Sequence, residues 1–224
     1  MIFLFTLKLW PLGPRPKKNV VFIGTSFTRA IFFECIKLVN HGNLGEEDKY
    51  IPSYTIPHAR GCNLPGKAGV DLGACGAPGF KVVENDEYRF IFHFKTYLYT
   101  PWADSVMLGR INTELGGQPA DLMVLGSAEW GTNKYINNVT TRDAQVVHFH
   151  DDFLVNIAAK KRLFIYNNGY NRSTKAMWEF YRRLPNWSIY DMAPLLQEMV
   201  GMSTGHGYYG YGTRKIFSQI LKIL

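Results

Sequence analysis

The sequence predicts a single α/β domain built on a mostly parallel β-sheet that is covered on both faces. Short apolar runs recur along the chain, and each is followed by a segment with helical spacing of its apolar residues. Such alternation is typical of parallel sheets, because parallel strands need crossover connections and the helices cover the sheet. The chain has 224 residues, 46% hydrophobic and 15% aromatic, which suits one large core. Neither an internal repeat nor a low-complexity tract interrupts this pattern.

The first expected strand covers residues 19–24 (NVVFIG), an apolar run that ends in glycine. Residues 27–39 follow as the first expected helix. The apolar positions that share one face of this helix are Phe27, Ile31, Cys35 and Val39. On that face Cys35 is expected to be a buried free thiol.

The rest of the chain continues the alternation after a long interruption. Residues 43–80 are rich in Gly and Pro and predict a long loop with room for one strand, and such loops tend to be functional. The later strands are expected at 88–94, 121–126, 162–166 and 187–190, and the later helices at 103–115, 143–159, 173–183 and 212–224. Active sites in such sheets lie beyond the carboxyl ends of the strands.

The expected organisation is an N-terminal apolar segment and Pro-rich linker over residues 1–18, followed by one domain over residues 19–224. The first ten residues, MIFLFTLKLW, are apolar but too short to span a bilayer. They are either the remnant of a signal anchor or a misread start of a longer chain. We expect the folded body to have no membrane span.

The surface charge is positive but scattered. The formal net charge of +7 comes from 25 Lys and Arg against 18 Asp and Glu, and the basic doublets are separated by acidic residues. We therefore expect no nucleic-acid partner. A basic nucleic-acid-binding domain is the weakest alternative, and strongly salt-dependent binding would be its sign.

Features of the secretory pathway are present. Glycosylation sequons occur at Asn138, Asn171 and Asn186. Cys62 and Cys75 flank a Gly-rich stretch and could form a disulfide with each other. Together with the apolar N-terminus these features favour a secretory or extracellular location. A cytoplasmic location is the alternative.

Ser26 is the first candidate for chemistry. It follows Gly24-Thr25 at the end of the first expected strand, where the start of a helix offers free backbone N–H groups to a developing oxyanion. Ser26 is then either a nucleophile or only the N-cap of the helix.

His206 is the second candidate. It lies in a Gly-rich stretch just before the last expected helix, as a positioned base would. A serine after the first strand and a histidine before the last helix face the same edge of the expected sheet, so each strengthens the assignment of the other.

Three segments resemble the PC-esterase (trichome-birefringence-like) branch of the SGNH, or GDSL-type, hydrolases. VVFIGTSFTRAIFFECIKLV is similar to the opening block of that family, with Gly24, Ser26 and Arg29 matching and Thr25 replacing an Asp. DLMVLGSAEWGTN (121–133) is similar to its third block, and STGHGYYGYGTRKIFSQILKIL is similar to its closing block. The resemblance implies a flavodoxin-like three-layer α/β/α sandwich, with Ser26 as nucleophile and His206 as base.

Two departures from the family pattern bear on activity. Ser203 stands where the family has the Asp of Asp-x-x-His, so Asp191 is the substitute that would orient the histidine. Loss of such a carboxylate costs about 10⁴ in turnover in a well-studied triad. The third block lacks the Asn that donates to the oxyanion, and Ser127 is the nearest donor. One missing donor costs about 10²–10³ in rate.

The expected site contains further residues and no cofactor. The oxyanion donors would be the N–H of Ser26, Ser127 and a glycine of the 61–79 segment, taken as Gly66. The residues expected to bind substrate are Arg29, Trp130 and Tyr208.

The segment HFHDD (148–152) suggests a metal site at first sight. In a helix His148 and Asp152 share a face while His150 points elsewhere, so three ligands do not converge and no metal is expected.

These observations lead to two hypotheses. The first is a serine esterase or O-acyltransferase acting on acyl esters, with acetyl groups on glycans favoured by the resemblance. The second is a catalytically weakened protein of the same fold that binds glycan or protein. The oligomeric state is left open.

Overall fold

The computed structural model describes residues 16–39, 80–94, 101–126, 139–166, 172–192, 220 and 222–223. The strands are β1 (Lys18–Gly24), β2 (Phe80–Glu84), β3 (Tyr88–Phe94), β4 (Leu122–Gly126), β5 (Arg162–Tyr166) and β6 (Trp187–Asp191). The helices are α1 (Ser26–Val39), α2 (Pro101–Leu115), α3 (Val139–His148), the π-helix η3 (Phe149–Leu154) and α4 (Arg172–Tyr181).

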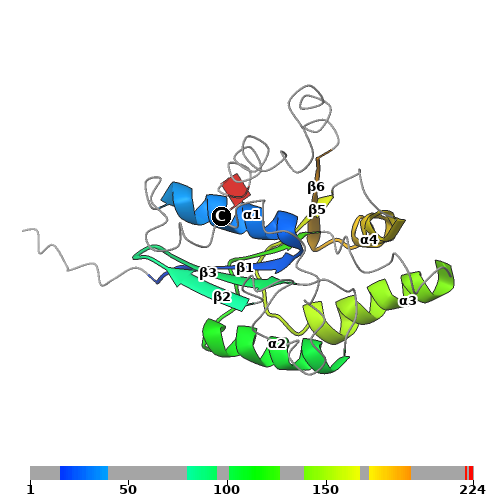
Figure 1. Cartoon of the computed structure of the whole chain (residues 1–224), viewed down its shortest axis with the longest axis horizontal. Coiled ribbons are helices and arrows are strands. Elements are labelled where there is room, and N and C mark those ends of the chain that lie inside the picture. The colour runs from blue at the N-terminus through cyan, green and yellow to red at the C-terminus, as the bar shows by residue number, and fades with distance from the viewer. Residues whose placement is uncertain are drawn as a thin grey trace, which may run out of the picture.

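The strands form one six-stranded sheet with the order β2-β3-β1-β4-β5-β6 (Figure 1). Strand β1 is parallel to both of its neighbours, β3 and β4, and the parallel pairing continues through β5 to β6. Among the described strands β2 alone runs antiparallel, on the outer side of β3. The predicted α/β class with a mostly parallel sheet is confirmed.

The antiparallel direction of β2 follows from the turn that joins it to β3. The side chain of Asn85 accepts hydrogen bonds from the N–H groups of Glu87 (2.9 Å) and Tyr88 (2.8 Å). This local bonding closes a tight turn, and a tight turn can join only antiparallel strands.

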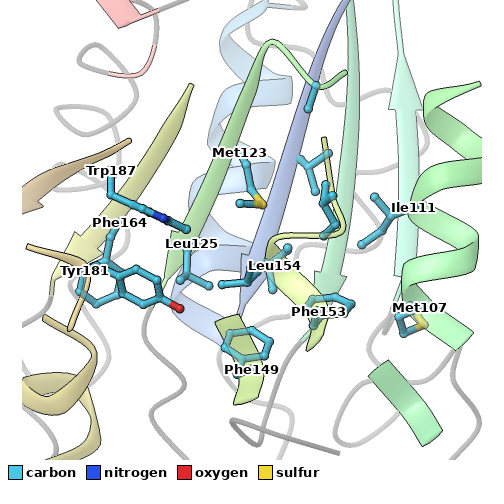
Figure 2. Close-up of a cluster of buried hydrophobic side chains, with 14 of the residues drawn as sticks. Met107, Ile111, Met123, Leu125, Phe149, Phe153, Leu154, Phe164, Tyr181 and Trp187 are labelled. Atoms are coloured by element: carbon cyan, nitrogen blue, oxygen red, sulfur yellow. The ribbon is translucent and has the colours of Figure 1, made fainter. Parts of the chain in front are cut away.

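Apolar side chains are buried on both faces of the sheet. On one face α1 contributes Ile31, Phe32, Cys35 and Ile36. On the other face side chains from α2, α3, η3 and α4 join those of the sheet in one cluster, and Figure 2 shows it from Met107 of α2 through Phe153 of η3 to Tyr181 of α4. In Figure 1, α1 lies on the opposite side of the sheet from α2 and α3.

The expected apolar face of α1 is largely confirmed. Ile31 and Cys35 are buried, Val39 is half-buried, and the side chain of Phe27 lies outside the described residues. Cys35 is a buried free thiol, as the sequence predicts.

The helix expected over 143–159 differs from prediction in length and form. It begins at Val139 and widens into η3 at Phe149, where the N–H of Val155 donates to the carbonyl of His150 (2.9 Å). The wider turn places Phe149 and Leu154, five residues apart, on the same buried face. Of the last expected helix the structure describes only residues 220, 222 and 223, which are helical.

A polar cluster fixes the amino edge of the sheet. The Asp121 carboxylate accepts hydrogen bonds from the N–H of Asn19 (2.8 Å) and from Nζ of Lys160 (2.7 Å). Burial would raise the pKa of Asp121, but the hydrogen bonds from Lys160 and Asn19 outweigh it and leave that pKa below its usual value. The cluster links the starts of β1, β4 and β5 and so holds their register.

Within the described ranges, we find no helix that combines the length and the apolar character needed to cross a bilayer.

Candidate active site at the carboxyl edge of the sheet

The candidate site lies where β1 and β4 end side by side. Their pairing runs up to Ile23 and Leu125, so Gly24 and Gly126 follow as neighbours at the edge. In the strand order, the strands that follow β1 in the chain, β2 and β3, lie on one side of β1, whereas β4 lies on its other side and is followed outward by β5. Such a switch point between adjacent parallel strands is where open α/β sheets have their binding crevice.

Helix α1 starts directly above this point. The N–H of Arg29 donates to the carbonyl of Thr25 (3.0 Å), which is the first hydrogen bond of the helix. Thr25 therefore occupies the N-cap position and Ser26 is the first helical residue, so Ser26 is not the N-cap. Backbone N–H groups of a first helical turn have no acceptor within the helix, and the helix dipole makes them suitable for an anion. The side chain of Ser26 lies outside the described residues.

Two threonines fill the space beneath the start of α1. Thr25 and Thr28 are both 0% exposed. A Cβ atom added at Gly24 would lie 2.1 Å from Oγ1 of Thr28, and one added at Gly126 would lie 1.8 Å from the same atom. Both distances are far below any van der Waals contact. The two strand ends must therefore be glycines for Thr28 to pack where it does.

Arg29, expected to bind substrate, is half-buried in the first turn of α1. Its Nη1 atom is shielded from solvent. The Arg29 guanidinium is thus partly buried, unlike that of a surface arginine whose side chain extends into solvent.

Asp191, expected to orient the base, is the last residue of β6 and is exposed. It belongs to the same edge as Ser26, but β4 and β5 stand between β6 and β1. Three strand spacings of about 4.8 Å put roughly 14 Å between the backbones of β1 and β6. A histidine that contacts both Ser26 and Asp191 has to lie over the ends of β4 and β5.

Several expected site residues lie outside the described part of the chain: Gly66, Ser127, Trp130, His206 and Tyr208. The same holds for Cys62, Cys75, Asn138 and Asn171, whereas Asn186 is exposed in the turn before β6. The structure thus places Ser26 and Arg29 in the first turn of α1, which Thr28 packs against Gly126, the residue before Ser127, and places Asp191 three strands away on the same edge.

The HFHDD segment spans the end of α3 and the first turn of η3. His148 and Asp152 share one side of the helix, with Nδ1 and Oδ2 3.5 Å apart. His150 turns away and packs edge-on against Phe180, with ring centroids 5.1 Å apart. These three side chains do not converge on one point.

Two buried polar residues escaped prediction. His93 is the second-last residue of β3, beside Ile23 of β1, and is 6% exposed with its ring edge-on to Phe153. Asp104 is 4% exposed in the first turn of α2. A histidine inside the apolar run YRFIFHF was the available signal for the first, and a carboxylate in a first helical turn for the second.

No protein-family model matches the chain, and no curated protein is significantly similar to it.

Proposed function

We propose that the protein is a serine esterase or O-acyltransferase that acts on acyl esters, with acetyl esters of glycans as the favoured substrate class. The observation that carries the proposal is the position of Ser26. It is the first residue of α1, directly beyond the carboxyl end of the central strand β1 and next to the switch point with β4. A hydroxyl-bearing residue there has unbonded backbone N–H groups around it.

The reaction would proceed in two transfers. Oγ of Ser26 attacks the acyl carbonyl while His206 takes its proton, and the leaving alcohol departs with that proton. Water or a sugar hydroxyl then attacks the acyl-enzyme, gives its proton to His206, and Oγ of Ser26 takes the proton back. No cofactor enters either step.

Other residues would stabilise and bind the reacting groups. The N–H of Ser26, Ser127 and Gly66 would donate to the oxyanion, and Asp191 would orient His206. Arg29, Trp130 and Tyr208 would bind substrate. The half-buried position of Arg29 in the first turn of α1 supports its part in this arrangement.

The strand order supports the architecture implied by the resemblance to the PC-esterase branch. Without the antiparallel strand β2, the parallel strands follow the order second-first-third-fourth-fifth. This is the order of flavodoxin-like doubly wound sheets. Apolar clusters on both faces of the sheet support a three-layer α/β/α sandwich.

A second candidate is a binding module of the same fold that has lost catalysis. The observation that favours it is the complete burial of Thr25, a neutral residue where the resembling family has an Asp. With Ser203 also in place of an Asp, two carboxylates of the family pattern are missing.

The test is labelling of the purified full-length protein with a fluorophosphonate probe. We expect the wild type to label and Ser26→Ala and His206→Ala to remain unlabelled. Ser105→Ala, at an exposed serine on α2, is the matched control and should label as the wild type does. A folded wild type that stays unlabelled would refute the enzyme and favour the binding module.

A further inference from the structure

We propose that Thr28 is a positioning residue that holds the first turn of α1 against the end of β4 through a contact with Gly126. The contact stands on the geometry alone. Its consequence for catalysis rests on the proposed function.

The contact is close on both sides of the threonine. Oγ1 of Thr28 lies over Gly24 and Gly126 so tightly that a Cβ on either residue would overlap it, at 2.1 and 1.8 Å. Gly24 also has a φ of 156°, which side-chain-bearing residues rarely adopt. Gly126 is not among the positive-φ glycines of the described residues. A glycine is therefore needed at position 126 only because a side chain there would overlap Thr28.

The Thr28 hydroxyl is an unusual group to bury in the space between Gly24 and Gly126. Thr28 is 0% exposed, and Oγ1 has no hydrogen-bond partner among the described residues. A buried hydroxyl left unpaired is destabilising. An oxygen is, however, smaller than the methyl group that valine would put in its place. We therefore infer that Oγ1 is retained because it fits the space between the two glycines.

The contact joins the two segments that the proposed reaction needs in register. Thr28 is two residues after Ser26, in a turn closed by the hydrogen bond from Arg29 to Thr25. Gly126 directly precedes Ser127, the expected second donor to the oxyanion. Misplacement of a reacting group by about 1 Å can reduce a rate about 10²-fold. The contact between Thr28 and Gly126 therefore sets how well the N–H of Ser26 and the donor Ser127 are placed to bind the same oxyanion.

The experiment uses four variants of the full chain: Thr28→Ala, Thr28→Ser, Gly126→Ala and the double variant Thr28→Ala/Gly126→Ala. Two quantities are measured for each, the melting temperature and the rate of fluorophosphonate labelling of Ser26. Thr113→Ala is the control, since its exposed hydroxyl only donates to the carbonyl of Gly109 (2.8 Å) on α2.

We expect Gly126→Ala to lower the melting temperature most, and the double variant to melt above Gly126→Ala because the overlap has been removed. We expect Thr28→Ala to label about 10- to 100-fold more slowly than the wild type. Thr28→Ser keeps Oγ1 and should restore most of that rate, while Thr113→Ala should label at the wild-type rate.

Each other outcome overturns a specific part of the proposal: the contact, its effect on catalysis, or the reaction itself. If the double variant melts no higher than Gly126→Ala, the contact does not exist in solution. If Thr28→Ala melts lower yet labels at the wild-type rate, Thr28 is only structural. If the wild type never labels although the melting temperatures show the coupling, the contact stands, and both the proposed reaction and the positioning role of Thr28 in it are refuted.

Discussion

Tyr166 and Asp191 are paired in register as the last residues of β5 and β6. Burial, the charge of Asp191 and the charge of Glu179 raise the pKa of the Tyr166 phenol above its usual value. A carboxylate that disfavours a nearby phenolate favours a nearby imidazolium. The end of β6 is therefore a suitable place for a residue that orients a catalytic histidine.

Asp191→Asn should lower the pKa of Tyr166, because one of the two negative charges that disfavour the phenolate is removed. The pKa should remain above the usual value, since burial is the largest cause of the shift. The measurement is a phenolate absorbance titration of Asp191→Asn and of the wild type, each compared with its Tyr166→Phe counterpart. Asp86→Asn, at an exposed aspartate in the β2–β3 turn, is the control and should leave the titration unchanged.

The same Asp191→Asn variant should label with fluorophosphonate up to about 10⁴-fold more slowly if Asp191 orients His206. Labelling at the wild-type rate would show that another group orients the histidine, even where the Tyr166 titration shifts as expected.

Tyr181→Phe should stabilise the protein by about 1 kcal/mol, because a buried hydroxyl without a partner costs about 1–3 kcal/mol. Tyr181 is 0% exposed beside Trp187 and Phe164 (Figure 2), and its hydroxyl has no hydrogen-bond partner among the described residues. Denaturant unfolding followed by tryptophan fluorescence reports the change, since the rings of Tyr181 and Trp187 are 4.4 Å apart. At half-buried Tyr88 the same substitution should stay within about 0.5 kcal/mol. A destabilised Tyr181→Phe would mean that the hydroxyl has a partner.

Tyr181 should also make the folded state sensitive to alkali. Burial, aided by the charge of Asp151, raises its pKa well above the usual value of about 10. The unfolded chain therefore loses this proton first, so the group leaves stability independent of pH below about pH 10 and lowers it as pH rises above that value. Tyr181→Phe should lose less stability than the wild type between neutral pH and pH values above about 10. Equal losses in the two proteins would contradict the assignment.

Asp121→Asn should cost about 1 kcal/mol at neutral pH, because the side chain keeps an acceptor for Asn19 but loses its charge pair with Lys160. The folded pKa of Asp121 is lowered. Its contribution is thus present above the unfolded pKa of about 4 and is lost as pH falls through the lower folded value. Acid unfolding curves should show a shallower pH dependence for Asp121→Asn. Lys160→Gln should lower stability by a similar amount, and the two losses should not add.

The sequence was sufficient for elements whose signals are local. The bounds of β1 and α1 fall within one residue of expectation, because an apolar run ends at Gly24 and an apolar helical face follows it. It was not sufficient where packing decides. The wide turn of η3 depends on Leu154 reaching the sheet together with Phe149, and a helical spacing pattern does not contain that information.

The candidate site divides in the same way. Ser26 could be found because a serine after a strand that ends in glycine is a local pattern. The part played by Thr28 could not, since it depends on the pairing of β1 with β4, which brings Gly24 beside a residue about a hundred positions later. The distance of Asp191 from β1 likewise follows from strand order, which spacing along the chain does not fix.

Strand β1 is paired on both sides, and Val20 to Ile23 are completely buried. Amide protons in such a strand exchange with solvent only when the whole domain opens, whereas peripheral segments exchange through local fluctuations. The end of β1, which leads into Ser26, is therefore expected to be among the slowest-exchanging of the described segments. Fraying at the periphery of the sheet would then leave the backbone position at the start of α1 unchanged.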